Sequence, residues 1–492
     1  MKVLILNSPW INNAVEYGIK SGTRFAAIRK KDRTLPYYPF PYALASTAAY
    51  LRKEGFDAHI KDAIAEEMST EQCLEYVSDF DPSLVVIEAF TPSIYVDLDF
   101  ARKVKERTGC WIALCGVHPS AQPEELLKNS FIDFILLNDF DIPLKELCYS
   151  LSNDHRKFDD IKSLAYKQND MIKVNELNTD FLDYDELPFP DREELPIKNY
   201  NEPLSKNFPN ARVSTTRGCP FNCTFCIEPF MYQRNYRRRS VNLVIQEIKM
   251  LKSKYGVKEI TFDDALFTVS RAKEIAKAFI ESGLKIEWTS WIDSRISLED
   301  LKLLKRSGCV AIKIAIESAN SDILNAIGKD RMVYIEKIKG LIRRCKKLNL
   351  LIHSSFMIGA PGETRESIRE TLDLAFSLGL DSTQFSIATP LPGTEFYKQA
   401  LKNNWLVTKN WKEYESIFSC VVEYPGCTSK DILMGMEEAR RRKVKQFINN
   451  PFTAIGYVWR LYKFLGFTKF SKDIFNKIKF IFNSFLQKHY AH

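Results

Sequence analysis

The run Arg217-Gly-Cys-Pro-Phe-Asn-Cys-Thr-Phe-Cys226 contains three cysteines, Cys219, Cys223 and Cys226, in the spacing C-x3-C-x2-C. Thiolates this close on one loop can converge on a soft metal centre. A cube of four irons and four sulfides has four irons to ligate, so three cysteines leave one iron open. An open coordination position is typical of a reactive metal site, as it is for catalytic zinc. The run therefore predicts a catalytic iron–sulfur centre.

Three other interpretations of these cysteines stay open. A structural zinc site normally needs four ligands, and no histidine lies between His155 and His353 to complete one locally. A disulfide beside a free thiol does not suit a chain without secretion features. The third alternative is chance clustering of buried thiols, because free cysteine is a common core residue.

The cysteine run resembles the signature of the radical S-adenosylmethionine (radical SAM) superfamily, with the aromatic Phe225 just before the third cysteine. The resemblance implies that the three cysteines hold a 4Fe–4S cluster and that Phe225 lies near SAM. It also implies that the open iron binds the amino and carboxylate groups of SAM. An electron from the cluster then splits the sulfonium and gives a 5′-deoxyadenosyl radical.

Length and composition fit a multidomain globular protein. A chain of 492 residues predicts two to four domains, and 45% hydrophobic and 27% charged residues are ordinary values for a soluble protein. The first apolar run is too short for a signal peptide, and no stretch approaches the 18 apolar residues of a membrane span. Eleven cysteines without a regular framework fit a reducing cytosol. We therefore expect a cytoplasmic protein.

Residues 1–153 alternate short apolar runs with helical patterns, which predicts an α/β, doubly wound, flavodoxin-like parallel sheet. Ligands of such sheets bind at the carboxyl ends of the strands. The expected strands are 3–6, 59–60, 84–87, 112–114 and 134–137, and the expected helices are 42–53, 70–80, 94–107 and 123–128. The candidate ligand-binding residues at the strand ends are Asn7, Ser8, Thr91, Gly116, His118 and Asn138.

This half resembles the cobalamin-binding domain that precedes many radical SAM domains. The matching segments are 39–55, 81–87 and 116–125. The resemblance implies cobalamin as a cofactor, bound by the strand-end residues. The motif D-x-H-x-x-G, which supplies a lower-axial histidine elsewhere, is missing, because Asp57-Ala-His59 is followed by Asp62 where glycine belongs. A vestigial corrin fold that binds nothing is the alternative, and a satisfied loop histidine is the alternative for His118.

Residues 154–210 form a connector in which 163–167 and 171–174 predict a small hairpin. Residues 211–403 alternate strand and helix again, and they resemble the partial (β/α)6 barrel of radical SAM enzymes. In such barrels the chemistry lies at the carboxyl ends of the strands. The six expected strands are 213–216, 259–262, 286–291, 310–316, 351–357 and 383–388.

Two acidic residues at strand ends are candidates for SAM binding. Asp264 lies in Phe262-Asp-Asp-Ala-Leu-Phe267, which resembles the family's F-x-D-D-x-F segment and implies a contact with the amino group of SAM. Its alternative role is to cap the following helix. Glu317 and Ser318 lie in a segment that resembles G-I-E-S, which implies that Glu317 accepts hydrogen bonds from the ribose. A buried, paired structural glutamate is the alternative.

Two further residues complete the candidate SAM site. Gly359 begins Gly359-Ala-Pro-Gly-Glu-Thr364, close to the family's G-x-P-G-E-T, and glycine lets the backbone approach the adenosine. Arg295 follows the third strand and is a candidate partner of the SAM carboxylate, with a surface ion pair as the alternative.

Residues 404–492 predict a mainly helical region that ends in a basic amphipathic tail. The chain has a net charge of +8, and Lys and Arg outnumber Asp and Glu most strongly after Glu437. Residues 440–492 combine basic and aromatic side chains, which favours peripheral contact with the inner face of the membrane. A helix folded back on the barrel and an RNA-binding segment are the alternatives; no nucleic-acid partner is expected.

Taken together, these motifs resemble a cobalamin-dependent radical SAM enzyme that methylates an unactivated carbon of a small or lipid-like molecule. The resemblance implies an electron donor such as flavodoxin or ferredoxin. An oxidative cyclase or rearrangement enzyme of the same architecture is the main alternative. A tRNA methylthiotransferase would have three more cysteines in its first domain and an RNA-binding barrel at its end, and neither is evident here. A cobalamin or iron–sulfur sensor would not cleave SAM.

Overall fold

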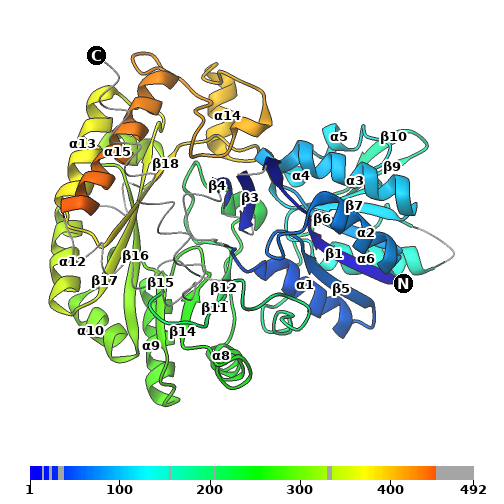
Figure 1. The fold of residues 1–492 in the computed structure, drawn as a ribbon, viewed down its shortest axis with the longest axis horizontal. Coiled ribbons are helices and arrows are strands. Elements are labelled where there is room, and N and C mark those ends of the chain that lie inside the picture. The colour runs from blue at the N-terminus through cyan, green and yellow to red at the C-terminus, as the bar shows by residue number, and fades with distance from the viewer. Residues whose placement is uncertain are drawn as a thin grey trace.

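The structure is a computed structural model that contains two large sheets, one from each half of the chain (Figure 1). The N-terminal sheet and the second sheet lie side by side, with strands β3 and β4 between them. The structure describes residues 1–13, 16–21, 25–30, 38–153, 157–200, 202, 205–329 and 335–449.

The N-terminal sheet has a parallel core in the order β5-β1-β6-β7-β8, which is the flavodoxin-like order and confirms the predicted doubly wound fold. Apolar side chains are buried on both faces of these strands because helices cover both sides. The strands are β1 (Lys2–Asn7), β5 (Asp57–Asp62), β6 (Leu84–Glu88), β7 (Trp111–Cys115) and β8 (Phe134–Leu136). The helices are α1 (Tyr42–Lys53), α2 (Thr70–Phe80), α3 (Ile94–Thr108), α4 (Val117–Ala121), α5 (Pro123–Leu126) and α6 (Asp141–Ser152).

The hairpin expected in the connector extends this sheet. Strand β9 (Leu164–Gln168) pairs antiparallel with β8, and β10 (Met171–Val174) pairs antiparallel with β9 at the edge. The N-terminal sheet therefore continues to Val174, past residue 153 where we placed the domain boundary.

A small antiparallel sheet, which was not predicted from the sequence, follows β1. It consists of β2 (Ile11–Asn13), β3 (Glu16–Ser21) and β4 (Phe25–Lys30). Lys20 of β3 is fully buried, and its ammonium lies 2.7 Å from the Asp97 carboxylate and 2.9 Å from the Ser8 hydroxyl. The small sheet is thereby fixed to the carboxyl edge of the N-terminal sheet.

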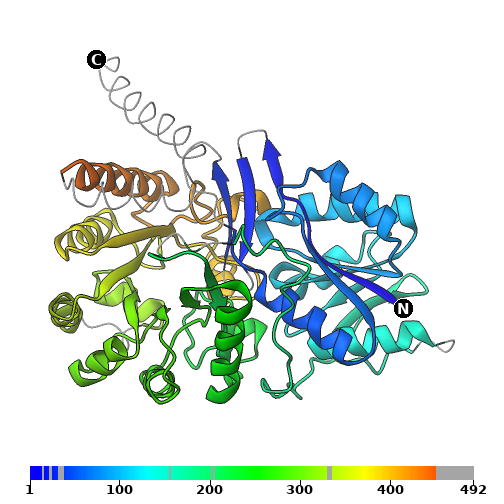
Figure 2. The same ribbon diagram turned by 60° about the horizontal axis from the view of Figure 1, so that its bottom comes forward.

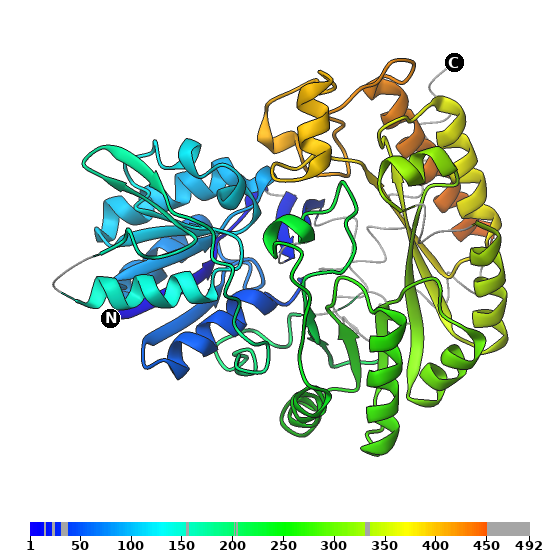
Figure 3. The same cartoon turned by 180° about the vertical axis from the view of Figure 1, so that it is seen from behind.

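The second sheet is a curled half-barrel of six parallel strands in the order β11-β14-β15-β16-β17-β18, and helices cover its outer face (Figures 1 and 3). It confirms the predicted partial barrel. The strands are β11 (Asn210–Val213), β14 (Glu259–Phe262), β15 (Glu287–Trp291), β16 (Cys309–Glu317), β17 (Leu351–Ile358) and β18 (Ser382–Ile387). The outer helices are α8 (Val241–Tyr255), α9 (Val269–Glu281), α10 (Leu298–Arg306), α12 (Ile335–Lys347) and α13 (Arg365–Ser377).

Short elements follow the first and fourth strands of the half-barrel at their carboxyl ends. After β11 come β12 (Thr216–Arg217), the cysteine run, α7 (Glu228–Met231) and β13 (Arg237–Arg238). After β16 comes α11 (Ser321–Ala326). The Thr224 amide of the cysteine run donates a hydrogen bond of 3.1 Å to the Ile327 carbonyl just after α11, so the two segments meet. Figure 2 shows the half-barrel (green to orange) and the N-terminal sheet (blue to cyan) as two adjacent halves of the molecule.

The C-terminal region contains α14 (Glu395–Lys402), a 3-10 turn at Trp411–Glu413, and α15 (Ser429–Asn449), which packs against α13 and β18. The basic residues 440–443 lie on α15, where Arg442 contacts Asp373 and Glu438. The amphipathic part of the predicted tail, residues 450–492, lies outside the described residues. No helix in the described part of the chain is long and apolar enough to cross a membrane.

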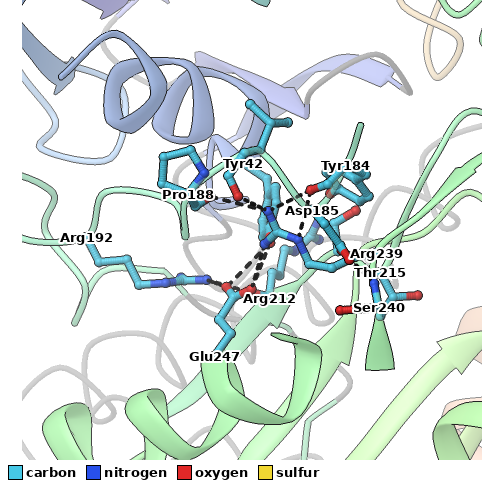
Figure 4. A network of polar contacts seen from close by, with 12 residues as sticks. Tyr42, Tyr184, Asp185, Pro188, Arg192, Arg212, Thr215, Arg239, Ser240 and Glu247 are labelled. Atoms are coloured by element: carbon cyan, nitrogen blue, oxygen red, sulfur yellow. Dashed lines mark hydrogen bonds and ion pairs between the residues drawn. The ribbon is translucent and has the colours of Figure 1, made fainter. Parts of the chain in front are cut away.

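A buried network of charged side chains joins the two halves of the molecule (Figure 4). Glu247 of α8 lies 3.0 Å from Arg192 of the connector and 3.6 Å from Arg239. The Tyr42 hydroxyl of α1 donates a hydrogen bond of 3.1 Å to the same carboxylate. Arg239 also donates to the carbonyls of Tyr184 and Leu187. One carboxylate thus links the N-terminal domain, the connector and the half-barrel.

Candidate active site

The half-barrel encloses a cavity of about 720 Å³, and all three cysteines of the run lie on its wall. They follow β12 and precede α7, at the carboxyl ends of the strands. A turn in which the Cys226 amide donates to the Cys223 carbonyl brings the second and third cysteines together. All three are free thiols. Burial raises the pKa of Cys219 to about 11 and also raises the pKa of Cys223 and Cys226, so a bound cation is needed to hold them as thiolates.

The cysteine arrangement fits an iron–sulfur cube better than a zinc ion. Among the described residues, no three His, Cys, Asp or Glu side chains converge closely enough for a single metal ion. A four-iron cube separates its cysteine ligands more widely than one ion does. Three thiols on one wall of a large cavity provide the ligand type that such a cube requires.

Asp264 hydrogen-bonds the segment that leads into the cysteine loop. Its carboxylate accepts hydrogen bonds from the Thr215 amide and hydroxyl, at 3.1 and 2.9 Å, and from the Thr216 hydroxyl. Gly218 precedes the first cysteine with φ +77°, and a Cβ there would lie 2.1 Å from the Asn235 carbonyl oxygen. Asp264 is fully buried and is not among the residues that line the cavity, so its carboxylate lies beneath the cysteine loop.

Glu317 and Phe225 line the same cavity as the cysteines. Glu317 ends β16 with φ +68°, and its carboxylate lies 2.9 Å from the Lys329 ammonium. The Lys329 ammonium is also 5.9 Å from the centre of the Phe225 ring. Burial acts to lower the pKa of Lys329, but the Glu317 carboxylate and the nearby Cys223 together outweigh burial and raise the pKa. The cavity therefore has a buried carboxylate–ammonium pair beside the cysteines.

The other three SAM candidates lie outside the cavity wall. The Ser318 hydroxyl lies 3.2 Å from the Thr371 hydroxyl, behind the strand end. The Gly359 carbonyl accepts a hydrogen bond of 2.8 Å from the Tyr424 hydroxyl, and a Cβ at this position would lie 3.0 Å from the Ile432 side chain of α15. Arg295 is about half-exposed and pairs with Asp293, which does line the cavity.

Several polar residues on the cavity wall were not predicted from the sequence. Lys313 and His353 come from the middle of β16 and near the start of β17, and Lys329 follows α11. The available signal was a lysine or histidine within an otherwise apolar strand, at positions that alternate with buried aliphatic residues.

The six candidate cobalamin residues share the carboxyl edge of the N-terminal sheet, and the side chains of all but Gly116 are buried there. Asn7 donates to Asp62 at 2.8 Å, and the Ser8 hydroxyl donates to Asp97 at 2.6 Å. His118 Nδ1 lies 3.3 Å from the Thr91 hydroxyl. Gly116 has φ +104°, and a Cβ there would lie 2.8 Å from the Ala89 carbonyl oxygen.

The cysteine loop contacts this sheet edge directly. Arg217, two residues before Cys219, pairs with Asp139 at 2.9 Å and also with Asp141. The Asn138 amide donates a hydrogen bond of 2.6 Å to the Phe230 carbonyl of α7. Both carboxylates raise the pKa of Arg217 despite its burial, which keeps the contact charged. The two candidate cofactor sites therefore adjoin each other.

Comparison with known proteins agrees with this geometry. Residues 213–375 match the family model of the radical SAM superfamily, and residues 32–147 match that of the B12 binding domain. The chain is 34% identical over 384 residues to the uncharacterized methyltransferase PH0819 of Pyrococcus horikoshii, covering 77% of this chain and 82% of that protein. The chain belongs to the cobalamin-dependent radical SAM methyltransferase family.

Two further comparisons describe the range of relatives of this radical SAM methyltransferase. The anaerobic magnesium-protoporphyrin IX monomethyl ester cyclase of Cereibacter sphaeroides is 29% identical over 73% of this chain and 60% of its own length. The structure of the radical SAM methyltransferase TsrM from Kitasatospora setae, with cobalamin and a 4Fe–4S cluster bound, has 17% identity. It superposes with a TM-score of 0.66, covering 82% of this chain and 75% of TsrM, and shares the fold.

The cofactors of this family are a 4Fe–4S cluster, SAM and cobalamin. Two buried polar atoms at the edge of the N-terminal sheet suit a hydrogen-bonding ligand such as the amide-rich corrin. Asn7 Oδ1 and His118 Nε2 have no hydrogen-bond partner among the described residues. Buried polar atoms without partners are rare in proteins and call for a ligand or water. The His118 ring also packs edge-on against Trp411, at 5.1 Å between ring centres.

Proposed function

We propose that this radical SAM methyltransferase transfers a methyl group from SAM, by way of cobalamin, to an unactivated carbon of a small molecule in the half-barrel cavity. The observation that supports it is the direct contact between the cysteine loop and the edge of the N-terminal sheet, through Arg217 and Asp139. Because the two cofactor sites adjoin each other, one bound substrate can contact both cofactors. When bound, the cluster and cobalamin supply radical formation from SAM and methyl delivery, respectively.

The residues of the chain have separate roles in this proposal. Cys219, Cys223 and Cys226 hold the cluster as thiolates, and Asp264 fixes the backbone of their loop. Glu317 presents a carboxylate to the hydroxyls of SAM, and Lys329 fixes its orientation at 2.9 Å. Phe225 supplies an apolar wall near SAM. We propose that Ser318, Gly359 and Arg295 shape the surroundings of this site.

We assign the cobalamin site to Asn7, Ser8, Thr91, Gly116, His118 and Asn138, at the edge of the N-terminal sheet. The support is their common position and the two unpartnered atoms on Asn7 and His118. The electron donor, the cytoplasmic location and the membrane contact of residues 440–492 stay predictions.

An oxidative cyclase is the second candidate, because one relative carries that name. The test supplies anaerobic, reduced enzyme with SAM labelled in its methyl group and with the small-molecule fraction of a cell extract. A methyltransferase places label in a new small molecule, and Cys223→Ala abolishes that transfer. Label that stays wholly in SAM and methionine while 5′-deoxyadenosine accumulates would favour the cyclase.

A further inference from the structure

The inner end of the half-barrel cavity has a row of four side chains on four neighbouring strands. Strand pairing aligns Trp291 of β15 with Lys313 of β16, Lys313 with His353 of β17, and His353 with Ser382 of β18. All four line the cavity. We call Trp291, Lys313, His353 and Ser382 the inner row. Lys313 precedes Glu317 by four residues on one strand, so the inner row lies about 13 Å deeper than the Glu317 end.

The Lys313 ammonium of the inner row shares its nearest carboxylate with another cation. The Arg212 guanidinium contacts both nearby carboxylates, Asp263 at 2.7 Å and Glu202 at 3.1 Å. The Lys313 ammonium has one ion-pair partner among the described residues, Glu202, at the longer distance of 3.5 Å. Lys443 of α15 also lines the cavity and donates to the Thr383 carbonyl. Arg212 and Lys313 therefore share the Glu202 carboxylate, and Lys313 has the longer contact with it.

Lys313 has hydrogen-bonding capacity that the protein does not use. An ammonium has three donors, and one looser contact to Glu202 does not satisfy them. Burial lowers the pKa of Lys313, and Glu202 acts against that effect. A buried ammonium without full hydrogen bonding is costly unless a ligand completes it.

His353 adds a second unsatisfied group to the same row. Its side chain is more than nine-tenths buried, and Nδ1 has no hydrogen-bond partner among the described residues. Burial, with a smaller effect of Lys313, lowers its pKa to about 3, so the ring is neutral near pH 7. A neutral imidazole still offers one donor and one acceptor. The Trp291 ring meets it edge-on, at 5.5 Å between ring centres, and forms an apolar wall beside it.

We propose that the inner row binds an anionic group of the substrate, a carboxylate or a phosphate. Lys313 pairs with the anion, His353 donates a hydrogen bond to it, and Trp291 packs against the adjoining apolar part of the substrate. The anion completes the hydrogen bonding of Lys313 and His353, and the rest of the molecule extends towards Glu317 and the cysteines. This inference rests on the proposed function, and it replaces the lipid-like substrate, because hydrocarbon against Lys313 would leave the ammonium unsatisfied.

The test compares three small probes of similar shape on the reconstituted holoenzyme: benzoate, phenyl phosphate and benzyl alcohol. Dissociation constants come from ligand-observed NMR titrations. We expect one of the two anions to bind about tenfold or more tightly than neutral benzyl alcohol, because a charge-assisted hydrogen bond contributes that much. The anion that binds more tightly identifies the substrate group as carboxylate or phosphate.

Substitutions of Lys313 and of Glu202 are expected to change the anion affinity in opposite directions. Lys313→Met is expected to weaken binding of the preferred anion about tenfold and to leave the affinity for benzyl alcohol unchanged. Lys313→Arg retains the charge and is expected to retain anion binding. Glu202→Gln removes the competing carboxylate and is expected to tighten anion binding. A purely structural Lys313–Glu202 pair would not change the ratio of anion to alcohol affinity in any of these variants.

The matched control is Lys302→Met, which removes an exposed lysine on the outer helix α10 and is expected to change no probe affinity. Should Lys313→Met fail to fold, Lys313→Arg and Glu202→Gln carry the test. The inference is overturned when neither anion binds better than benzyl alcohol, or when Glu202→Gln and Lys313→Met leave their affinities unchanged. Failure of the proposed function appears separately, as label that never leaves SAM in the methyl-transfer assay.

Discussion

The Glu247 carboxylate of α8 lies 3.0 Å from the Arg192 guanidinium of the connector, and both side chains are buried. Glu247 also accepts a hydrogen bond from Tyr42 of the N-terminal domain. A carboxylate that neutralises buried cations at the junction of three segments cannot be removed without leaving those cations unpaired.

We therefore expect Glu247→Ala to lower the free energy of unfolding of the cofactor-free protein by about 3–5 kcal/mol. The control is Glu336→Ala on α12, which removes a largely exposed partner of Lys339 and is expected to change the free energy of unfolding far less. Urea unfolding followed by circular dichroism measures both. Equal effects of the two substitutions would contradict the role of Glu247 at the domain junction.

Gly218 is expected to be necessary for cluster assembly. Its φ of +77° and the Asn235 carbonyl oxygen, 2.1 Å from a built Cβ, exclude a side chain without movement of the loop. Gly218→Ala should strain the loop by about 1–3 kcal/mol and lower the iron bound per polypeptide after reconstitution. Gly340→Ala, in the interior of α12 with open space around it, should bind normal iron and stabilise the helix by up to about 1 kcal/mol. Normal iron content in Gly218→Ala would contradict this account of the loop.

Lys329 is expected to act as a positioning residue for Glu317. Lys329→Met removes the ammonium 2.9 Å from the carboxylate, and we expect the dissociation constant for SAM to rise about tenfold. Lys329→Arg retains the charge and should recover most of the affinity. Equilibrium dialysis with labelled SAM measures binding apart from turnover. An unchanged SAM affinity in Lys329→Met would show that the Glu317–Lys329 pair does not contact SAM.

His118 is expected to make stability depend on pH. Burial lowers its pKa from 6.5 to about 3 in the folded protein. Below pH 6.5 the unfolded chain takes up a proton on His118 that the folded protein does not. The stability that neutral His118 contributes to the folded protein is therefore complete above pH 6.5, and it is lost as the pH falls towards 3.

The measurement compares the wild type with His118→Gln, without cobalamin, at pH 7 and pH 5. Between these values the wild type should lose about 2 kcal/mol more than the variant. Burial raises the pKa of Glu88 to about 7 and that of Asp62 to about 6, which gives an opposite trend, but both groups are present in both proteins. A stability difference that is the same at both pH values would contradict the lowered pKa of His118.

The sequence predicted the elements whose pattern is local. Helices α1 and α2 have the expected bounds, because the apolar positions recur with helical spacing and Ser69 caps α2 with a reciprocal bond to Gln72. Strand β14 also has its expected bounds, as a short apolar run. The small β2–β3–β4 sheet was missed because its strands depend on contacts such as Lys20 with Asp97, which are far apart in sequence.

The candidate site was predictable in its position but not in the direction of every side chain. The cysteines and Glu317 line one cavity because the carboxyl ends of parallel strands meet at one edge. Asp264 follows a strand end too, yet it turns under the cysteine loop towards Thr215. Ser318 likewise turns behind its strand towards Thr371. Those directions depend on neighbouring segments, which the motif alone does not specify.

The most direct test of the central claim, that SAM and cobalamin meet at adjoining sites, is a single-turnover labelling measurement. The protein is reconstituted without oxygen with iron, sulfide and cobalamin, reduced, and given SAM labelled in its methyl group. The account predicts that label passes from SAM to the protein-bound cobalamin. Label found only in SAM and methionine, on protein that contains both cofactors, would contradict it.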